Sequence, residues 1–113
     1  MTSTPKVLVA AADLPNASTL LYTSPAGGKG TWIDKATSVN HSAGAVTVTV
    51  NLVPAAGAAG NTNVVTNAQS IAAAGLYAYA ELIGKFLNPG DMIYAQCSAA
   101  TSANFAVNGR ELT

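Results

Sequence analysis

Residues Ala45 to Pro54 read AVTVTVNLVP, and this stretch indicates the fold class. One face of the extended segment is apolar and the other is polar. The apolar face holds Val46, Val48, Val50 and Leu52, and the polar face holds Thr47, Thr49 and Asn51. This period of two, built from β-branched residues, predicts a half-buried β-strand. No residue in it carries chemistry, which favours packing and contact over catalysis.

Seven further segments have the composition of short strands separated by turn residues. They are Lys6–Ala12, Ser18–Ser24, Thr31–Asn40, Asn63–Ala72, Leu76–Leu82, Met92–Ala99 and Ala103–Leu112. Because short one-sided strands bury their apolar faces by packing two sheets together, we predict an all-β fold. The expected architecture is an antiparallel β-sandwich, jelly-roll-like, with about eight strands. Residues 1–113 are expected to form this single domain.

Three local features accompany this prediction. The segments Thr31–Asn40 and Ala45–Pro54, joined by the turn His41–Gly44, are expected to pair as an antiparallel hairpin. Ala55–Thr62 is rich in Ala and Gly and is expected to be a flexible loop. Residues 1–5 are polar and precede the first strand, so we expect an N-terminal arm there.

The chain carries little charge. Only 9% of its residues are charged, against roughly 25% in ordinary soluble domains, while 50% are hydrophobic. Five basic and five acidic residues cancel, so no basic surface is available for nucleic acid or an anionic membrane. No apolar segment approaches the ~18 residues of a membrane-spanning helix. A neutral surface with little self-repulsion predicts a homo-oligomer whose surface is covered by neighbours.

The residue types that carry catalysis are isolated in the sequence. His41 is the only histidine and lies in a turn, and the five carboxylates are scattered singly. Gly27–Gly30 lacks the spacing of a phosphate-binding loop and reads as a turn. Cys97 is the only cysteine, which excludes an intrachain disulfide and a zinc knuckle. We therefore expect no enzyme activity, no cofactor and no metal.

Aromatic residues are the remaining candidates for a binding surface. They are Tyr22, Trp32, Tyr77, Tyr79, Phe86, Tyr94 and Phe105. Stacking on a sugar stays open, since it needs aromatic rings and neutral polar groups, but core or subunit packing is favoured. The predicted contact residues are Trp32, Tyr77 and Tyr79, together with Thr2, Ser3 and Thr4 of the N-terminal arm.

The order of several short motifs resembles a group of small tailed-bacteriophage virion proteins, which includes the jelly-roll cement (decoration) proteins of capsids. Leu21–Gly30 (LYTSPAGGKG) is similar to an "LYT-x-PAG-x-x-G" opening, and Val39–Ser42 and Ile71–Gly75 are similar to the family's turns. The strand Val46–Val50 is followed by Leu52–Pro54. Leu87–Ile93 (LNPGDMI) resembles "L-x-x-GD-x-I", and Val107–Leu112 (VNGREL) resembles "V-x-G-x-E-hydrophobic".

This resemblance spans about Leu20 to Leu112, and its specificity lies in the order of the motifs. It implies a trimeric cement protein on the capsid exterior that bridges subunits of the major capsid protein and stabilises the head. The N-terminal strand and the Ala-rich loops depart from the pattern. Some tail- and fibre-associated phage proteins show the same motif order, so a receptor-binding, glycan-binding or adaptor role remains the alternative.

Overall fold

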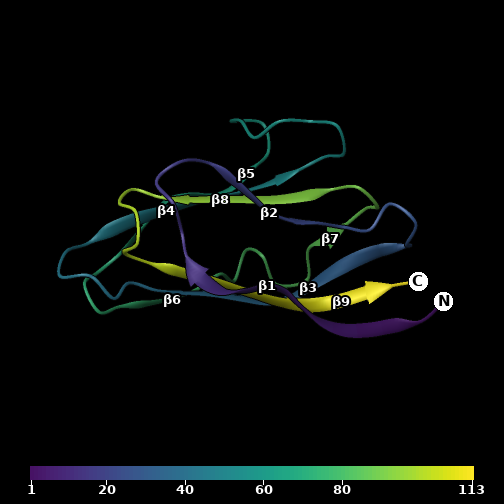
Figure 1. Ribbon diagram of the computed structural model, residues 1–113, viewed down its shortest axis with the longest axis horizontal. Helices are drawn as coiled ribbons and strands as arrows, with labels where there is room; N and C mark the ends of the chain where they lie inside the picture. The colour runs from purple at the N-terminus through teal and green to yellow at the C-terminus, as the bar shows by residue number, and fades with distance from the viewer.

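A computed structural model describes all residues from 1 to 113 as two antiparallel sheets packed face to face (Figure 1). Nine strands make up the sheets. They are β1 (Ser3–Asp13), β2 (Thr19–Thr23), β3 (Gly30–Val39), β4 (Val46–Val53), β5 (Val64–Ile71), β6 (Leu76–Ala78), β7 (Phe86–Leu87), β8 (Met92–Cys97) and β9 (Asn104–Leu112). Sheet A has the order β1-β9-β3-β6, with β7 also paired to β3, and sheet B has the order β2-β8-β4-β5.

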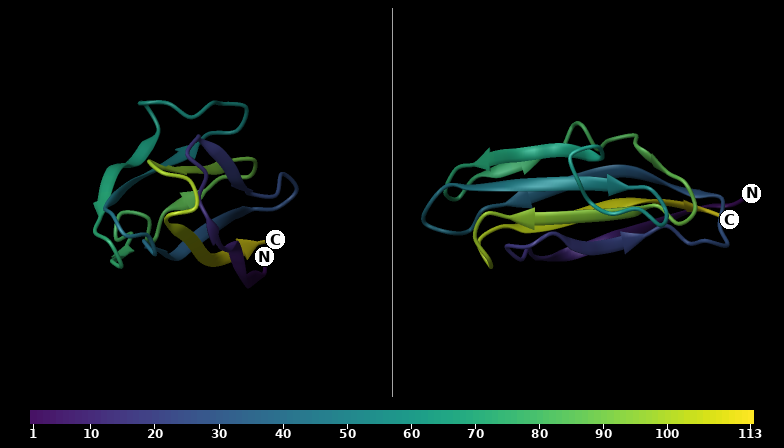
Figure 2. Two further views of the ribbon diagram at one scale, coloured as in Figure 1. Left: turned by 60° about the vertical axis from the view of Figure 1, so that its left-hand side comes forward. Right: turned by 90° about the horizontal axis from the view of Figure 1, so that it is seen from above.

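The strand pairs are nested along the chain. β4 pairs with β5, β3 with β6, β2 with β8, and β1 with β9, and successive pairs alternate between the two sheets. This arrangement, in which one long antiparallel ribbon wraps into two sheets, is the jelly roll. The predicted fold class is therefore confirmed, and both views in Figure 2 show the two layers.

The core lies between the two sheets. Val48 and Val50 of β4 are fully buried against residues such as Ile33 and Phe105 of sheet A, and Leu52 packs against the same cluster. The alternation that predicted the central strand thus describes its inner face correctly. On its outer face Asn51 and Val53 are also buried, because residues 54–63 fold back over the end of β4.

The predicted hairpin between the third and fourth strands is wrong. β3 belongs to sheet A and β4 to sheet B, so residues 40–45 carry the chain from one layer to the other. The buried side chain of Asn40 secures this crossing, because its amide donates to the carbonyl oxygens of Gly44, Ile71 and Ala72. The strand that actually pairs with β4 along the chain is β5, after the longer loop of residues 54–63.

The prediction of an N-terminal arm is also wrong, because most of these residues belong to a strand. Ser3 begins β1, where Ser3 pairs with Leu112 and Thr4 with Glu111. The backbone of Thr2 exchanges two 2.9 Å hydrogen bonds with Thr113, so the chain ends lie side by side (Figure 1). The polar composition that suggested a free arm is the composition of a strand at the solvent-exposed edge of a sheet.

The segment predicted as a strand over Leu76–Leu82 is only partly extended. β6 stops at Ala78, and the next residues form successive turns that insert Tyr79 and Leu82 into the core. The turns return the chain to β3 as the two-residue strand β7, which the sequence did not predict. Gly30 (φ +126°) permits this return, because a Cβ there would overlap the ring of Phe86.

Candidate interaction surfaces

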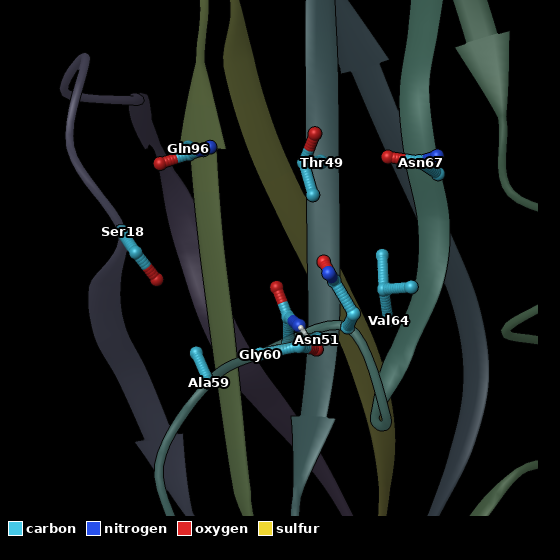
Figure 3. A pocket seen from close by; sticks show the side chains of 9 residues that line it. Ser18, Thr49, Asn51, Ala59, Gly60, Val64, Asn67 and Gln96 are labelled. Atoms are coloured by element: carbon cyan, nitrogen blue, oxygen red, sulfur yellow. Dashed lines mark hydrogen bonds between the residues drawn. The ribbon is translucent and has the colours of Figure 1, made fainter.

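A groove of about 260 Å³ opens on the outer face of sheet B (Figure 3). It is called the B groove below. Its floor comes from β4, β8 and β5, one side comes from the segment before β2, and residues 59–61 form its lower wall. The lining residues are Ser18, Thr49, Asn51, Ala59, Gly60, Asn61, Val64, Asn67 and Gln96.

The B groove is polar but uncharged. Four of its side chains are carboxamides and two are hydroxyls, whereas Ala59 and Val64 are its only apolar side chains. Each carboxamide offers donors and an acceptor, and each hydroxyl can do both. The groove therefore presents hydrogen-bonding capacity of both kinds without an ion.

Hydrogen bonds centred on Asn63 hold the loop over the B groove. The Oδ1 atom of Asn63 accepts from the side chain of Asn51 at 2.8 Å and from the backbone of Gly60 at 3.1 Å. Its Nδ2 atom donates to the carbonyl oxygen of Ala58 at 2.9 Å. The Ala- and Gly-rich composition predicted a flexible loop, but in the structure these bonds tie it to β4. The side chain that does so lies just beyond the predicted loop.

A β-bulge in β5 shapes the part of the B groove beside Asn67. Val48 pairs with Gln69 and Val50 with Thr66, so Asn67 and Ala68 together face the single residue Thr49. Ala68 has a left-handed backbone (φ +49°), and its N–H donates to the hydroxyl oxygen of Thr49 at 3.0 Å. Bulges of this kind redirect the side chain at the irregularity, which here is Asn67 at the rim of the groove.

The outer face of sheet A, called the A face below, is different in character. Its outward positions include Val7 on β1, Trp32 and Val39 on β3, Leu76 on β6 and Phe86 on β7. Val7 is 58% exposed and Leu76 is 66% exposed. Trp32 and Phe86 pack edge to face, with ring centroids 4.8 Å apart. No element covers this partly apolar surface within one copy of the chain.

One ion pair lies in the middle of the A face. A bulge in β3 leaves Asp34 without a partner on β9, and Arg110 donates to both carboxylate oxygens of Asp34 at 2.9 to 3.1 Å. The hydrogen bonds and charge of Asp34 raise the pKa of Arg110 above its ordinary value. Beside this pair, a shallow depression of about 420 Å³ crosses β1, β9 and β3.

The structure places the predicted aromatic contact residues in different environments: Trp32 lies apart from Tyr77 and Tyr79, whose rings pack edge to face with centroids 4.7 Å apart. Trp32 lies on the A face and is partly exposed. Tyr77 is half-buried at the edge of sheet A and donates to Glu81 at 2.9 Å. Tyr79 is fully buried, packs edge to face on Phe105 with centroids 5.3 Å apart, and shares a 2.7 Å hydrogen bond with Ser38. We therefore correct its assignment from contact residue to core residue.

The predicted contacts of the N-terminal segment lie at a sheet edge. Thr2, Ser3 and Thr4 are all exposed. β1 is an outermost strand of sheet A, so one side of its backbone faces away from β9. These residues are thus accessible to another molecule, although as an edge strand and not as a free arm.

Several titratable residues are paired with one another across elements. His41 contacts Asp13 through Nε2 at 2.7 Å, and Lys6 contacts Glu111 at 3.2 Å. Tyr22 donates to Glu111, and burial together with this hydrogen bond raises the pKa of Tyr22 to about 12. Burial also raises the pKa of Tyr79. No group of three or more His, Cys, Asp or Glu side chains is placed to hold a metal ion, and Cys97 is buried.

The residues of the B groove were missed by sequence reasoning, because they come from four separate segments. One feature of the sequence does indicate part of the groove. Residues 61–69 read NTNVVTNAQ and concentrate carboxamides beside the loop. Their convergence with Ser18, Thr49 and Gln96 depends on the order of strands in sheet B, which the strand pattern alone does not give.

Comparisons with protein-family models, curated proteins and solved structures found no match to this chain. No helix in the structure is long and apolar enough to cross a membrane.

Proposed function

We propose that this chain is a non-enzymatic virion protein of the capsid cement (decoration) type. It binds to the capsid exterior as a homotrimer and bridges subunits of the major capsid protein. The observation that carries the proposal is the A face, where partly exposed apolar residues such as Trp32, Val39 and Leu76 lie on a rigid sheet. The jelly roll supports it, since this fold is common in viral capsid proteins and in lectins.

The A face suits a protein surface better than a small ligand. It is broad and shallow, and it mixes apolar side chains with the Asp34–Arg110 pair. Few charges have to be desolvated when it is covered, which lowers the cost of burial. A modest contact by each copy becomes tight when several copies are joined and bind together. The cement function needs no cofactor.

The free edge of β1 supplies a second mode of contact. β1 has eleven residues, of which only Leu8 and Val9 are buried. Backbone groups on an exposed edge can pair with a strand of a neighbouring chain. Thr2, Ser3 and Thr4 lie at the beginning of this edge. Deleting residues 2–4 is therefore expected to weaken capsid binding, and unchanged binding would remove this contact from the proposal.

The non-enzymatic part of the proposal is supported by the partners of the only histidine. The ring of His41 contacts Asp13, and no hydroxyl or thiol is hydrogen-bonded to it. The neighbouring hydroxyl of Ser42 is bonded to Asn40 and Gly44. A nucleophile activated by a base requires such a contact.

A second candidate function is that of a tail- or fibre-associated virion protein with a receptor-binding, glycan-binding or adaptor role. The B groove favours it, because an uncharged recess lined by hydrogen-bonding side chains is not needed for a cement contact on the A face.

Electron microscopy of assembled particles tests the location. A labelled copy of the protein, expressed with the genome that encodes it, is expected to appear on the head surface at sites where capsomers meet. Labelling of the tail or fibres would support the second candidate instead. Particles without any label would overturn both.

The A face is tested through the oligomeric state. Wild-type protein is expected to sediment as a trimer. Trp32→Ala is expected to shift it toward monomer, because a large aromatic side chain is lost from the contact between copies. Tyr94→Ala is the matched control, since Tyr94 is an aromatic residue at an outward position of sheet B. A monomeric wild type, or equal effects of the two variants, would contradict the role of the A face.

A further inference from the structure

We propose that the B groove binds one ring of a neutral saccharide through its carboxamide and hydroxyl side chains. This inference does not depend on a virion role, because it follows from the chemistry of the groove alone. Three features carry it: the absence of charge, the unused hydrogen-bonding groups, and the fixed positions of two side chains in the groove floor.

The absence of charge limits the ligand class. No Lys, Arg, Asp, Glu or His lines the groove, so neither an anion nor a cation would find a counter-charge there. Only Ala59 and Val64 are apolar, so an apolar ligand would leave most of the polar wall without partners. A neutral ligand rich in hydrogen-bonding groups is the class that fits.

The groove has free hydrogen-bonding capacity. The side chains of Ser18, Asn67 and Gln96 make no hydrogen bond within the chain, although each is directed to the groove (Figure 3). Asn51 uses its Nδ2 atom to bind Gly60 and Asn63, which leaves its Oδ1 atom as an acceptor. Thr49 accepts from Ala68, which leaves its hydroxyl proton to donate. The recess therefore offers both free donors and free acceptors, as the hydroxyls of a sugar require.

Two side chains in the floor of the groove are held in place before a ligand arrives. Asn51 is only 7% exposed and is fixed by Asn63, while Thr49 is fixed by the backbone of Ala68. Ala68 adopts a left-handed backbone that costs an alanine free energy, and such positions concentrate at ligand sites. Pre-ordered side chains reduce the entropy lost on binding.

The size of the groove sets the size of the ligand. Its volume of about 260 Å³ lies just below the ~300 Å³ at which pockets for drug-sized molecules begin. A single sugar ring matches this volume, whereas a longer saccharide would extend out of the recess over Ser18 or Asn67.

A peptide is the competing ligand, because carboxamides also bind backbone amides. A peptide strand carries side chains that need pockets of their own for specificity. The B groove has one recess and little apolar wall, so it lacks those pockets. The saccharide is therefore the ligand that the groove favours.

The test is a titration of ¹⁵N-labelled protein with free glucose, galactose, mannose and N-acetylglucosamine, followed by NMR. At least one sugar is expected to shift the side-chain amide signals of Asn67 and Gln96. Asn67→Ala and Gln96→Ala are each expected to weaken binding roughly threefold to tenfold, the effect of one hydrogen bond. The exposed Asn108 on the A face provides the matched control, and Asn108→Ala is expected to leave the affinity unchanged.

Several outcomes would overturn the proposal. They are the absence of shifts with every sugar, equal weakening by Asn108→Ala, and shifts at the same amides by tetra-alanine but by no sugar. A second arm presents the responding sugar as the end of an immobilised glycan. Binding there would identify a chain terminus as the ligand source, and binding of the free sugar alone would identify a soluble one.

Discussion

The two outer faces of the sandwich are made from strands of one jelly roll, yet they differ in charge and in cover. The A face carries an ion pair, exposed apolar residues and the Trp32–Phe86 pair, and nothing lies over it. The outward positions of β4, β5 and β8 on sheet B carry Thr, Ser, Asn and Gln together with Tyr94, Val64 and Val53 but no charged residue, and the loop of residues 54–63 covers part of them. One face is suited to broad protein contact and the other to a small neutral ligand.

This difference shows that the nested pairing of strands determines which residues form the core. It does not determine which residue types occupy each outer face. If the two faces are independent, a change in the shared core should affect both, while a change on one face should leave the other intact. Four predictions follow this division, from the largest expected effect to the smallest.

Tyr79→Ala tests the shared core. Removing a fully buried ring that packs on Phe105 should destabilise the fold by about 4 kcal/mol. Urea denaturation measures the loss. Tyr79→Phe, which keeps the ring but leaves the hydroxyl of Ser38 without its partner, should cost about 1 to 2 kcal/mol. A loss below about 1 kcal/mol for Tyr79→Ala, combined with dissociation of the oligomer, would restore Tyr79 as a contact residue.

Asn63→Ala tests the cover of the B groove. The variant loses three side-chain hydrogen bonds, one to Asn51 of β4 and two within the loop to Gly60 and Ala58, so the free energy of unfolding should fall by about 2 kcal/mol. Hydrogen exchange of the Gly60 amide should accelerate, while the amides of β9 keep their relative protection. Asn61→Ala is the matched control in the same loop and should change stability by less than about 0.5 kcal/mol. Equal effects of the two variants would contradict the anchoring role of Asn63.

Ala68→Gly tests the bulge of the B groove. Glycine relieves the left-handed strain at φ +49°, which outweighs its greater chain entropy, so stability should rise by about 0.5 kcal/mol. Ala106→Gly on the A face should lower stability by about 0.5 to 1 kcal/mol, because Ala106 lies in an ordinary strand. Differential scanning calorimetry should therefore give shifts of opposite sign. A shift of the same sign for both would contradict the bulge geometry.

A change of pH tests the connection between the sheets at Glu81. This carboxylate accepts hydrogen bonds from Thr66 of sheet B at 2.6 Å and from Tyr77 of sheet A at 2.9 Å. Burial acts to raise the pKa of Glu81, but the hydrogen bonds from Thr66, its own backbone and Tyr77 together lower it below the ordinary 4.5. The unfolded chain therefore takes up the proton more readily than the folded chain.

The contribution of Glu81 should be present above pH 4.5 and be lost as the pH falls through its lower folded value. Glu81→Gln keeps one acceptor oxygen but does not titrate, so the difference in unfolding free energy between wild type and variant should shrink in acid. Urea titrations at a series of pH values measure this difference. A difference that is constant with pH would exclude the role of the Glu81 charge.

The sequence predicted the fold class because each sheet has one face in the core and one face outward. Buried and more exposed residues therefore alternate along β3, β4, β8 and β9. It did not predict which strands pair. A short turn such as His41–Gly44 usually indicates a hairpin, but here the buried carboxamide of Asn40 donates to the carbonyl oxygens of Gly44 in the turn and of Ile71 at the end of β5. These bonds hold the chain where it passes from sheet A to sheet B. That role depends on tertiary neighbours, so no local pattern shows it.

The candidate surfaces were predicted even less completely, for a similar reason. Trp32 was found because a large aromatic residue on a strand is visible in the sequence. Tyr77 and Tyr79 alternate like residues on one strand face, and their rings do contact each other, with centroids 4.7 Å apart. That face is turned toward the core, however, so Tyr77 packs against the core and Tyr79 is fully buried. The B groove depends on a bulge at Ala68 and on the bonds of Asn63, and both are set by the distant strand β4.

The adjacent chain ends have a mechanical consequence. Thr2 and Thr113 exchange two backbone hydrogen bonds, and from there β1 runs antiparallel beside β9 (Figure 1). A force that pulls the two ends apart would act on one pair of hydrogen bonds at a time and would peel β1 away from its neighbour. A force applied along the sheet is shared by many bonds at once. A load on this protein should therefore be resisted better when it is applied along the sheet than when it separates the two chain ends.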